Sequence, residues 1–177
     1  YSLFLMLTSL FSQISHGGSP HYLDNFNNVP VVFSNNQNKV LYDRDNVPEY
    51  FIFGDEYIVD IDFFNEAIYY PVLGGNVYLL SIKSSGAKSI GLEMDLFFLS
   101  PGLEMFVYSY DRSMFIGSFT SRNNKLHNKF STTLVKGDQI IIEVFIPSNI
   151  INESVVKISK IIHDFSDLLN FYSNQDS

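Results

Sequence analysis

The 177-residue sequence has no cysteine and no tryptophan, and it is short of basic side chains. Without cysteine, the chain forms no disulfide and offers no thiol chemistry and no cysteine-based zinc site. The 11 Lys and Arg are outnumbered by 19 Asp and Glu, which gives a formal net charge of -8. Because phosphate backbones bind to concentrated basic surfaces, this balance argues against nucleic acid as a partner.

What the sequence has in abundance is apolar and aromatic side chains. Hydrophobic residues make up 46% of the chain, and they include 17 Phe and 11 Tyr. This composition favours a packed, aromatic-rich β protein and argues against disorder. The length fits one domain of about 100 to 200 residues, and we expect a monomer.

The stretch 84–124 predicts consecutive antiparallel strands. From Ile90 to Phe98 apolar residues fall at every second position, and Glu93 and Asp95 lie on the other face, the period of a half-buried strand. Ser100-Pro101-Gly102 then supplies a turn. Two further strands are predicted over residues 103–110 and 114–120.

Strand patterns continue on both sides of this stretch. The remaining candidates cover residues 50–53, 57–64, 77–82, 130–135, 139–146 and 155–163. Residues 139–146 carry apolar side chains on both faces, which indicates a central strand. Helical periodicity is almost absent, so the sequence predicts an all-β fold: an antiparallel β-sandwich of jelly-roll or CUB-like type.

The stretch 84–124 also carries a family resemblance, which continues downstream. The segments that carry it are Gly86–Ile90, Leu99–Tyr108 and Ile116–Asn124 within the stretch, and Gly137–Glu143 and Ile158–His163 after it. In these segments the chain resembles the N-terminal non-catalytic domain of secreted, lysyl-endopeptidase-like serine proteases of Bacteroidota. The likeness covers most of residues 13–165.

The resemblance implies a function. It identifies residues 13–165 as a non-catalytic domain of a secreted serine endopeptidase that assists folding or restrains the protease. Residues 166–177 would then be a linker toward a C-terminal protease domain of the same polypeptide, the expected partner. The alternative is a binding module that holds a secreted protein on a glycan or protein surface. A free-standing enzyme is the third and least favoured interpretation.

The first residues indicate export. Residues 3–11 form an uncharged apolar run, shorter than the roughly 20 residues that span a bilayer but suited to the core of a signal peptide. We therefore interpret residues 1–12 as a partial signal peptide without its basic region and expect a secreted protein with no stable membrane insertion. The alternative is a buried strand or helix. Residues 14–20 resemble the mature start of the same protease family.

Catalytic motifs are not evident. The chain has no Gly-x-Ser-x-Gly elbow, and its histidines are His16, His21, His127 and His163. His163 ends a predicted strand, where a bond to a backbone carbonyl is a simpler role than that of a catalytic base. We therefore expect no enzymatic activity in this chain.

Four carboxylates are candidate metal ligands. Asp60 and Asp62 alternate on one predicted strand and Glu93 and Asp95 on another, so neighbouring strands could present four oxygens to calcium. A plain solvated face fits the same spacing and is favoured. Glycoside hydrolysis by paired carboxylates is disfavoured because no Trp is present to bind sugar. We expect no cofactor apart from this possible structural calcium.

Aromatic residues are the candidates for an interaction surface. Phe106, Tyr108 and Tyr110 share one face of a predicted strand and would form an exposed patch, or else the second face of the core. Phe171 and Tyr172 belong to a C-terminal segment, residues 165–177, that is predicted to be a short amphipathic helical turn or a linker. Contact with a protease domain is expected through one of these two regions.

Overall fold

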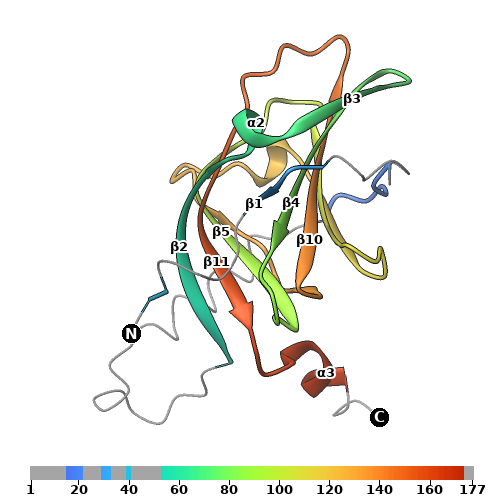
Figure 1. The fold of residues 1–177 in the computed structure, drawn as a ribbon. Helices are drawn as coiled ribbons and strands as arrows, with labels where there is room; N and C mark the ends of the chain where they lie inside the picture. Colours follow the sequence, from blue (N-terminus) through green and yellow to red (C-terminus); the bar gives the residue numbers. More distant parts are fainter. Residues whose placement is uncertain (1–14, 22–28, 33–38, 41–52, 174–177) are drawn as a thin grey trace.

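The computed structural model describes residues 15–21, 29–32, 39–40 and 53–173. Two β-sheets stack face to face, and a short helix follows the last strand (Figure 1). In these ranges no helix has the length and apolar character needed to cross a membrane. The elements are β1 Val31–Val32, β2 Gly54–Asp62, α2 Phe63–Glu66, β3 Ile68–Val72, β4 Gly75–Lys83, β5 Ser89–Phe98, β6 Glu104–Ser109, β7 Phe115–Phe119, η3 Ser121–Asn123, β8 Phe130–Ser131, β9 Val135–Lys136, β10 Gln139–Pro147, β11 Val155–Asp164 and α3 Leu168–Ser173.

The described strands form two sheets. Sheet A has the order β1-β4-β10-β6-β7, with β3 also paired to β4. Sheet B has the order β2-β11-β5-β8, with β9 also paired to β5. The pairings are antiparallel except that of β1 with β4. The predicted all-β sandwich is thus confirmed.

Strand β10 is central, as its two apolar faces predict. It pairs with β4 on one side and with β6 on the other. Ile140, Ile142 and Val144 point into the core between the sheets. Ile141 and Glu143 alternate with them and point away from sheet B, onto the outer face of sheet A. The outer face is therefore apolar as well, with one carboxylate in it.

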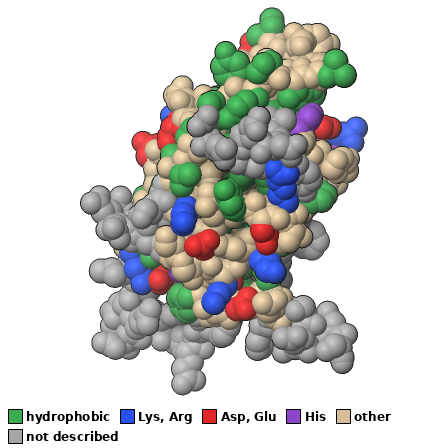
Figure 2. Space-filling view, turned by 45° about the vertical axis from the view of Figure 1, so that its right-hand side comes forward, with side chains coloured by type: hydrophobic (Ala, Val, Ile, Leu, Met, Phe, Trp, Pro, Cys, Tyr) green, Lys and Arg blue, Asp and Glu red, His purple; other side chains and the backbone are tan. Residues whose placement is uncertain are grey.

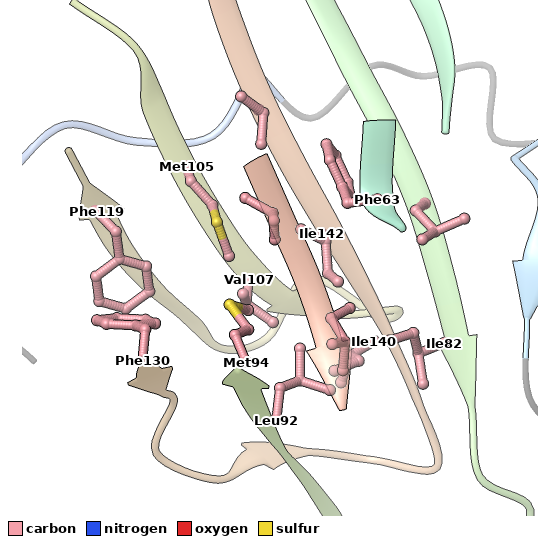
Figure 3. Close-up of a cluster of buried hydrophobic side chains, with 14 of the residues drawn as sticks. Phe63, Ile82, Leu92, Met94, Met105, Val107, Phe119, Phe130, Ile140 and Ile142 are labelled. Carbon is pink, nitrogen blue, oxygen red and sulfur yellow. The ribbon is translucent and has the colours of Figure 1, made fainter. Parts of the chain in front are cut away.

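The core between the sheets is filled by side chains from both layers. Figure 3 shows Leu92 and Met94 of β5 lying opposite Ile140 and Ile142 of β10. These four side chains are at most 2% exposed. Burying each contributes about 1.5 to 3 kcal/mol relative to exposure, so this layer supplies much of the stability.

The alternation predicted for residues 90–98 holds only for the first half of β5. A β-bulge at Asp95 shifts the register of β5 against β11, because one extra residue stands on β5. Beyond it, Phe97 is buried and stacks on Phe130 with ring centroids 4.4 Å apart, whereas Phe98 is 38% exposed. The prediction that Leu96 and Phe98 face the core is therefore wrong.

Other strand predictions differ in detail. The strand expected over residues 130–135 is two short pairings, β8 and β9, on the same edge of β5. The hairpin partner β3 was not predicted. Residues 50–52 and the expected signal peptide, residues 1–12, lie outside the described residues.

Leu92 and Glu93 test this register. Leu92→Ala should lower the free energy of unfolding by about 2 to 5 kcal/mol, because the side chain is fully buried. Glu93→Ala should cost less than about 1 kcal/mol, since Glu93 makes a partly exposed ion pair. Urea denaturation of the two variants measures both values, and equal losses would contradict the assignment.

Candidate functional site

The N-terminal strap, residues 15–21, lies on the outer face of sheet A. At β7 the His16 N–H donates to the Ser118 carbonyl at 3.0 Å, and the Ser118 N–H donates to the Gly17 carbonyl at 3.2 Å. The Ser118 hydroxyl donates to the same Gly17 carbonyl at 2.8 Å, and the Ser15 hydroxyl donates to the Gly117 carbonyl. The strap therefore begins hydrogen-bonded to the edge strand of the sheet.

From β7 the strap crosses toward β10. Gly17 and Gly18 have φ of +87° and +88°, a conformation that favours glycine. A Cβ on Gly18 would lie 3.4 Å from the Phe106 ring, so the backbone packs directly on that aromatic side chain. Pro20 is buried and His21 reaches β10. The Gly-Gly-Ser-Pro sequence thus allows a close, strongly bent crossing.

The surface under the strap is a second hydrophobic cluster. Its buried members come from the three central strands of sheet A, and partly buried side chains of β3 and β10 pack against them. The buried residues are Val77, Leu79, Phe106, Tyr108 and Ile141. Left open to water, such a face would be an unusually large apolar patch.

Glu143 lies in the middle of this cluster and is 0% exposed. The Tyr108 hydroxyl donates to Glu143 Oε2 at 3.0 Å. The His21 backbone N–H donates to Glu143 Oε1 at 2.7 Å, and His21 Nδ1 lies 3.1 Å from the same oxygen. The His21 ring also packs on Phe145, with centroids 4.7 Å apart. Because a buried carboxylate needs donors, Glu143 fixes where the strap docks.

This arrangement holds the strap on the sheet. Both carboxylate oxygens of Glu143 are occupied by donors from the protein itself, and the strap covers them. The His21 side chain is 33% exposed and that of Glu143 is 0% exposed, so water contacts the pair at His21 and not at the carboxylate. The contacts of His21 with Glu143 therefore join the strap to the sheet.

The contact between the His21 ring and Glu143 predicts that the two side chains are energetically coupled. In a double-mutant cycle, His21→Ala and Glu143→Gln should be non-additive by at least about 0.5 kcal/mol of unfolding free energy, because they share a contact. The matched cycle of His21→Ala with Glu93→Gln, on the other sheet, should be additive. Additivity in both cycles would mean that the His21 side chain does not contact Glu143.

The expected exposed aromatic patch is not found. Phe106 and Tyr108 are fully buried, because the strap and the rest of the second cluster cover them. Tyr110 alone of the three is exposed, at 53%. The prediction of an interaction surface at Phe106 and Tyr108 is therefore wrong, and these residues form a second face of the core. The side chains of Phe171 and Tyr172 lie outside the described part of the structure.

The four candidate metal ligands are not on neighbouring strands. Asp60 and Asp62 lie on β2 and Glu93 and Asp95 on β5, and β11 runs between these strands. The carboxylate of Asp62 also accepts the Asn65 N–H, which caps α2. Within the described ranges, no three His, Cys, Asp or Glu side chains group closely enough to hold a metal ion.

Two lysines of β11 form ion pairs with carboxylates of β2 and β5. Lys160 Nζ lies 3.1 Å from Glu56 and 3.3 Å from Glu93, and Lys157 Nζ lies 3.9 Å from Asp62. Burial lowers the pKa of Lys160, but its hydrogen bond to Glu56 and the charges of Glu93 and Glu56 together raise it above the usual value. These three ion pairs join β11 to its two neighbouring strands on the outer face of sheet B, which favours the solvated-face interpretation.

A serine and a histidine meet at the end of the sandwich near α3. His163 Nδ1 lies 2.7 Å from the hydroxyl oxygen of Ser84, the residue that directly follows β4 of the opposite sheet. The predicted bond of His163 to a backbone carbonyl is therefore replaced, at Nδ1, by a bond to this hydroxyl. Ser84 is 0% exposed, so its hydroxyl cannot meet a substrate. The pair links the two sheets instead of forming a nucleophile.

Charged groups surround His163. Lys39 Nζ bonds Asp55 at 2.7 Å, and Asp55 pairs with His163 across β2 and β11. Burial lowers the pKa of His163, and the charge of Lys39 acts in the same direction, while Asp55 and Asp164 oppose them. The folded protein therefore prefers the neutral imidazole.

This preference predicts a pH dependence of stability. An unfolded histidine titrates near about 6.5, so below that pH the unfolded chain binds more protons than the native one at His163, and the free energy of unfolding falls. The loss should continue down to the lower folded pKa. Urea denaturation between pH 7.5 and 5 should show a smaller loss for His163→Gln than for wild type. The control His127→Gln, at an exposed histidine, should keep the wild-type slope.

Comparison of the chain with protein-family models, with curated proteins and with solved structures gave no match. The resemblance to protease N-terminal domains therefore stays a prediction.

The role of Glu143 in docking the strap was not predicted from the sequence. The available signal was Glu143 itself, the one charged residue in a strand with apolar side chains on both faces. Such a residue is buried when the strand is central, and it then needs a hydrogen-bond partner. No local pattern identifies His21 as that partner, since 122 residues separate the two in sequence.

Proposed function

We propose that this chain is the non-catalytic N-terminal domain of a secreted serine endopeptidase, where it assists folding or restrains the protease. The resemblance in the central strands and the sandwich fold support the proposal. The buried contact of Ser84 with His163 supports it as well, because its geometry links sheets and does not present a nucleophile.

The observation that carries the proposal is the ordered end of the sandwich after β11. Asp164 is 0% exposed, and its carboxylate accepts the Ser89 hydroxyl at 2.6 Å, the Ser166 N–H at 2.8 Å and the Leu168 N–H at 3.0 Å. The Leu168 N–H belongs to the first residue of α3, so Asp164 fixes the start of that helix.

Next to this anchor the chain exposes an aromatic side chain. Phe165 is 43% exposed, although its backbone N–H is held by the Phe53 carbonyl at 3.1 Å. A rigidly held, exposed Phe followed by a short helix is a surface on which a neighbouring domain can pack. We propose that the protease domain of the same polypeptide makes this contact.

Refolding in trans tests the proposal. The domain alone should show no peptidase activity, and its addition to the denatured protease domain should raise the yield of active enzyme or slow substrate turnover. Truncation after Asp164, or Phe165→Ser, should weaken that effect because each removes the proposed contact. Leu126→Ser is the matched control, since Leu126 is 106% exposed in a different loop. Peptidase activity in the domain, or no effect on the protease, would contradict the proposal.

A second candidate function is that of an accessory binding module for glycan or protein surfaces. It is favoured by a separate observation, two exposed aromatic side chains beside the β6–β7 turn. Tyr110 and Phe115 are 53% and 42% exposed there. Binding of the purified domain to glycans or cell-surface proteins, with no effect on the protease, would favour this function.

A further inference from the structure

The apolar tip is formed by the β3–β4 turn with the adjoining part of β3 and by the β10–β11 loop. In Figure 1 the two loops project at one end of the sandwich, and α3 lies at the other end. Figure 2 shows hydrophobic side chains gathered at that upper end, above most of the visible charged residues. The exposed apolar residues of the tip are Tyr69, at 59%, Leu73, at 102%, and Ile151, at 84%, together with Pro71.

The two loops hold each other in place. The Ser148 N–H donates to the Gly74 carbonyl at 2.8 Å, and the Ile150 N–H closes a turn on the Pro147 carbonyl at 3.0 Å. Gly74 has φ of +88°, which a residue with a side chain rarely adopts. Leu73 precedes Gly74 in this hydrogen-bonded turn, and its side chain is exposed to solvent.

The charge of the tip distinguishes among possible partners. Residues 67–82 and 144–156 contain no Lys or Arg, and their one charged residue is Glu153. Anionic lipids and acidic proteins attract basic residues, so neither is complementary to this end of the molecule.

The size of the tip argues against a stable protein interface. Such interfaces bury about 800 Å² on each partner, with some 20 to 30 residues a side. Two narrow loop ends with four exposed apolar residues fall well short of that. Insertion into the headgroup region of a bilayer needs only a few apolar side chains, and Tyr suits the boundary between water and lipid.

We propose that the apolar tip makes a reversible, peripheral contact with an electrically neutral lipid surface, with Leu73 and Ile151 as the inserted side chains. Tyr69 lies beside them at headgroup level. The contact is independent of the proposed protease contact, because the tip and α3 are at opposite ends of the sandwich.

The chain has no Trp, so one introduced Trp reports on one position. The full chain carrying Leu73→Trp is mixed with phosphatidylcholine vesicles, and Leu126→Trp serves as the matched control, since Leu126 is 106% exposed outside the tip. We expect the emission of Leu73→Trp to shift to the blue and to be quenched by lipids brominated in their acyl chains. The control should show neither effect.

Adding Ile151→Ser to Leu73→Trp should weaken vesicle partitioning by about tenfold or more, because one aliphatic side chain is removed from the lipid. Anionic phosphatidylglycerol should give no gain in binding. The lipid proposal is overturned if Leu73→Trp does not respond to vesicles, or if both Trp variants respond alike. A blue shift that grows with protein concentration without vesicles would assign the tip to a second copy of the chain and would equally overturn it.

Discussion

The carboxylate of Glu143 is the group on which the outer half of this molecule depends. It stands at the centre of an apolar sheet face, and its donors are Tyr108 from the neighbouring strand and His21 from the strap. A charge buried without partners would destabilise the fold by several kcal/mol, so the strap is held at one place and in one register. Closing the face in this way hides Phe106 and Tyr108 and removes the sheet surface as a contact region.

With that face closed, exposed apolar side chains at the two ends of the sandwich are the proposed contacts. One end carries Phe165 beside a helix fixed by Asp164. The other end carries Leu73 and Ile151 on two loops that are tied together. Their separation is compatible with both proposals, a protease domain in contact with one end and a lipid surface in contact with the other.

The period-2 patterns predicted the fold class, the central strand β10 and most strand positions, because burial on one or both faces dictates that periodicity. They failed after Asp95, since a bulge reverses the faces and leaves no mark in the pattern. The site was less predictable. The partners of Glu143 and His163 come from distant segments, and the Phe106 and Tyr108 pattern looks the same whether water or a strap covers it.

The most direct test of this account is a nuclear Overhauser spectrum of the full chain in solution. The ring centroids of His21 and Phe145 are 4.7 Å apart when the strap is docked, so cross-peaks between their ring protons are predicted. Cross-peaks between the paired strands β10 and β6 serve as the internal reference. If the strand cross-peaks are present and those between His21 and Phe145 are absent, the strap does not close sheet A, and the account is contradicted.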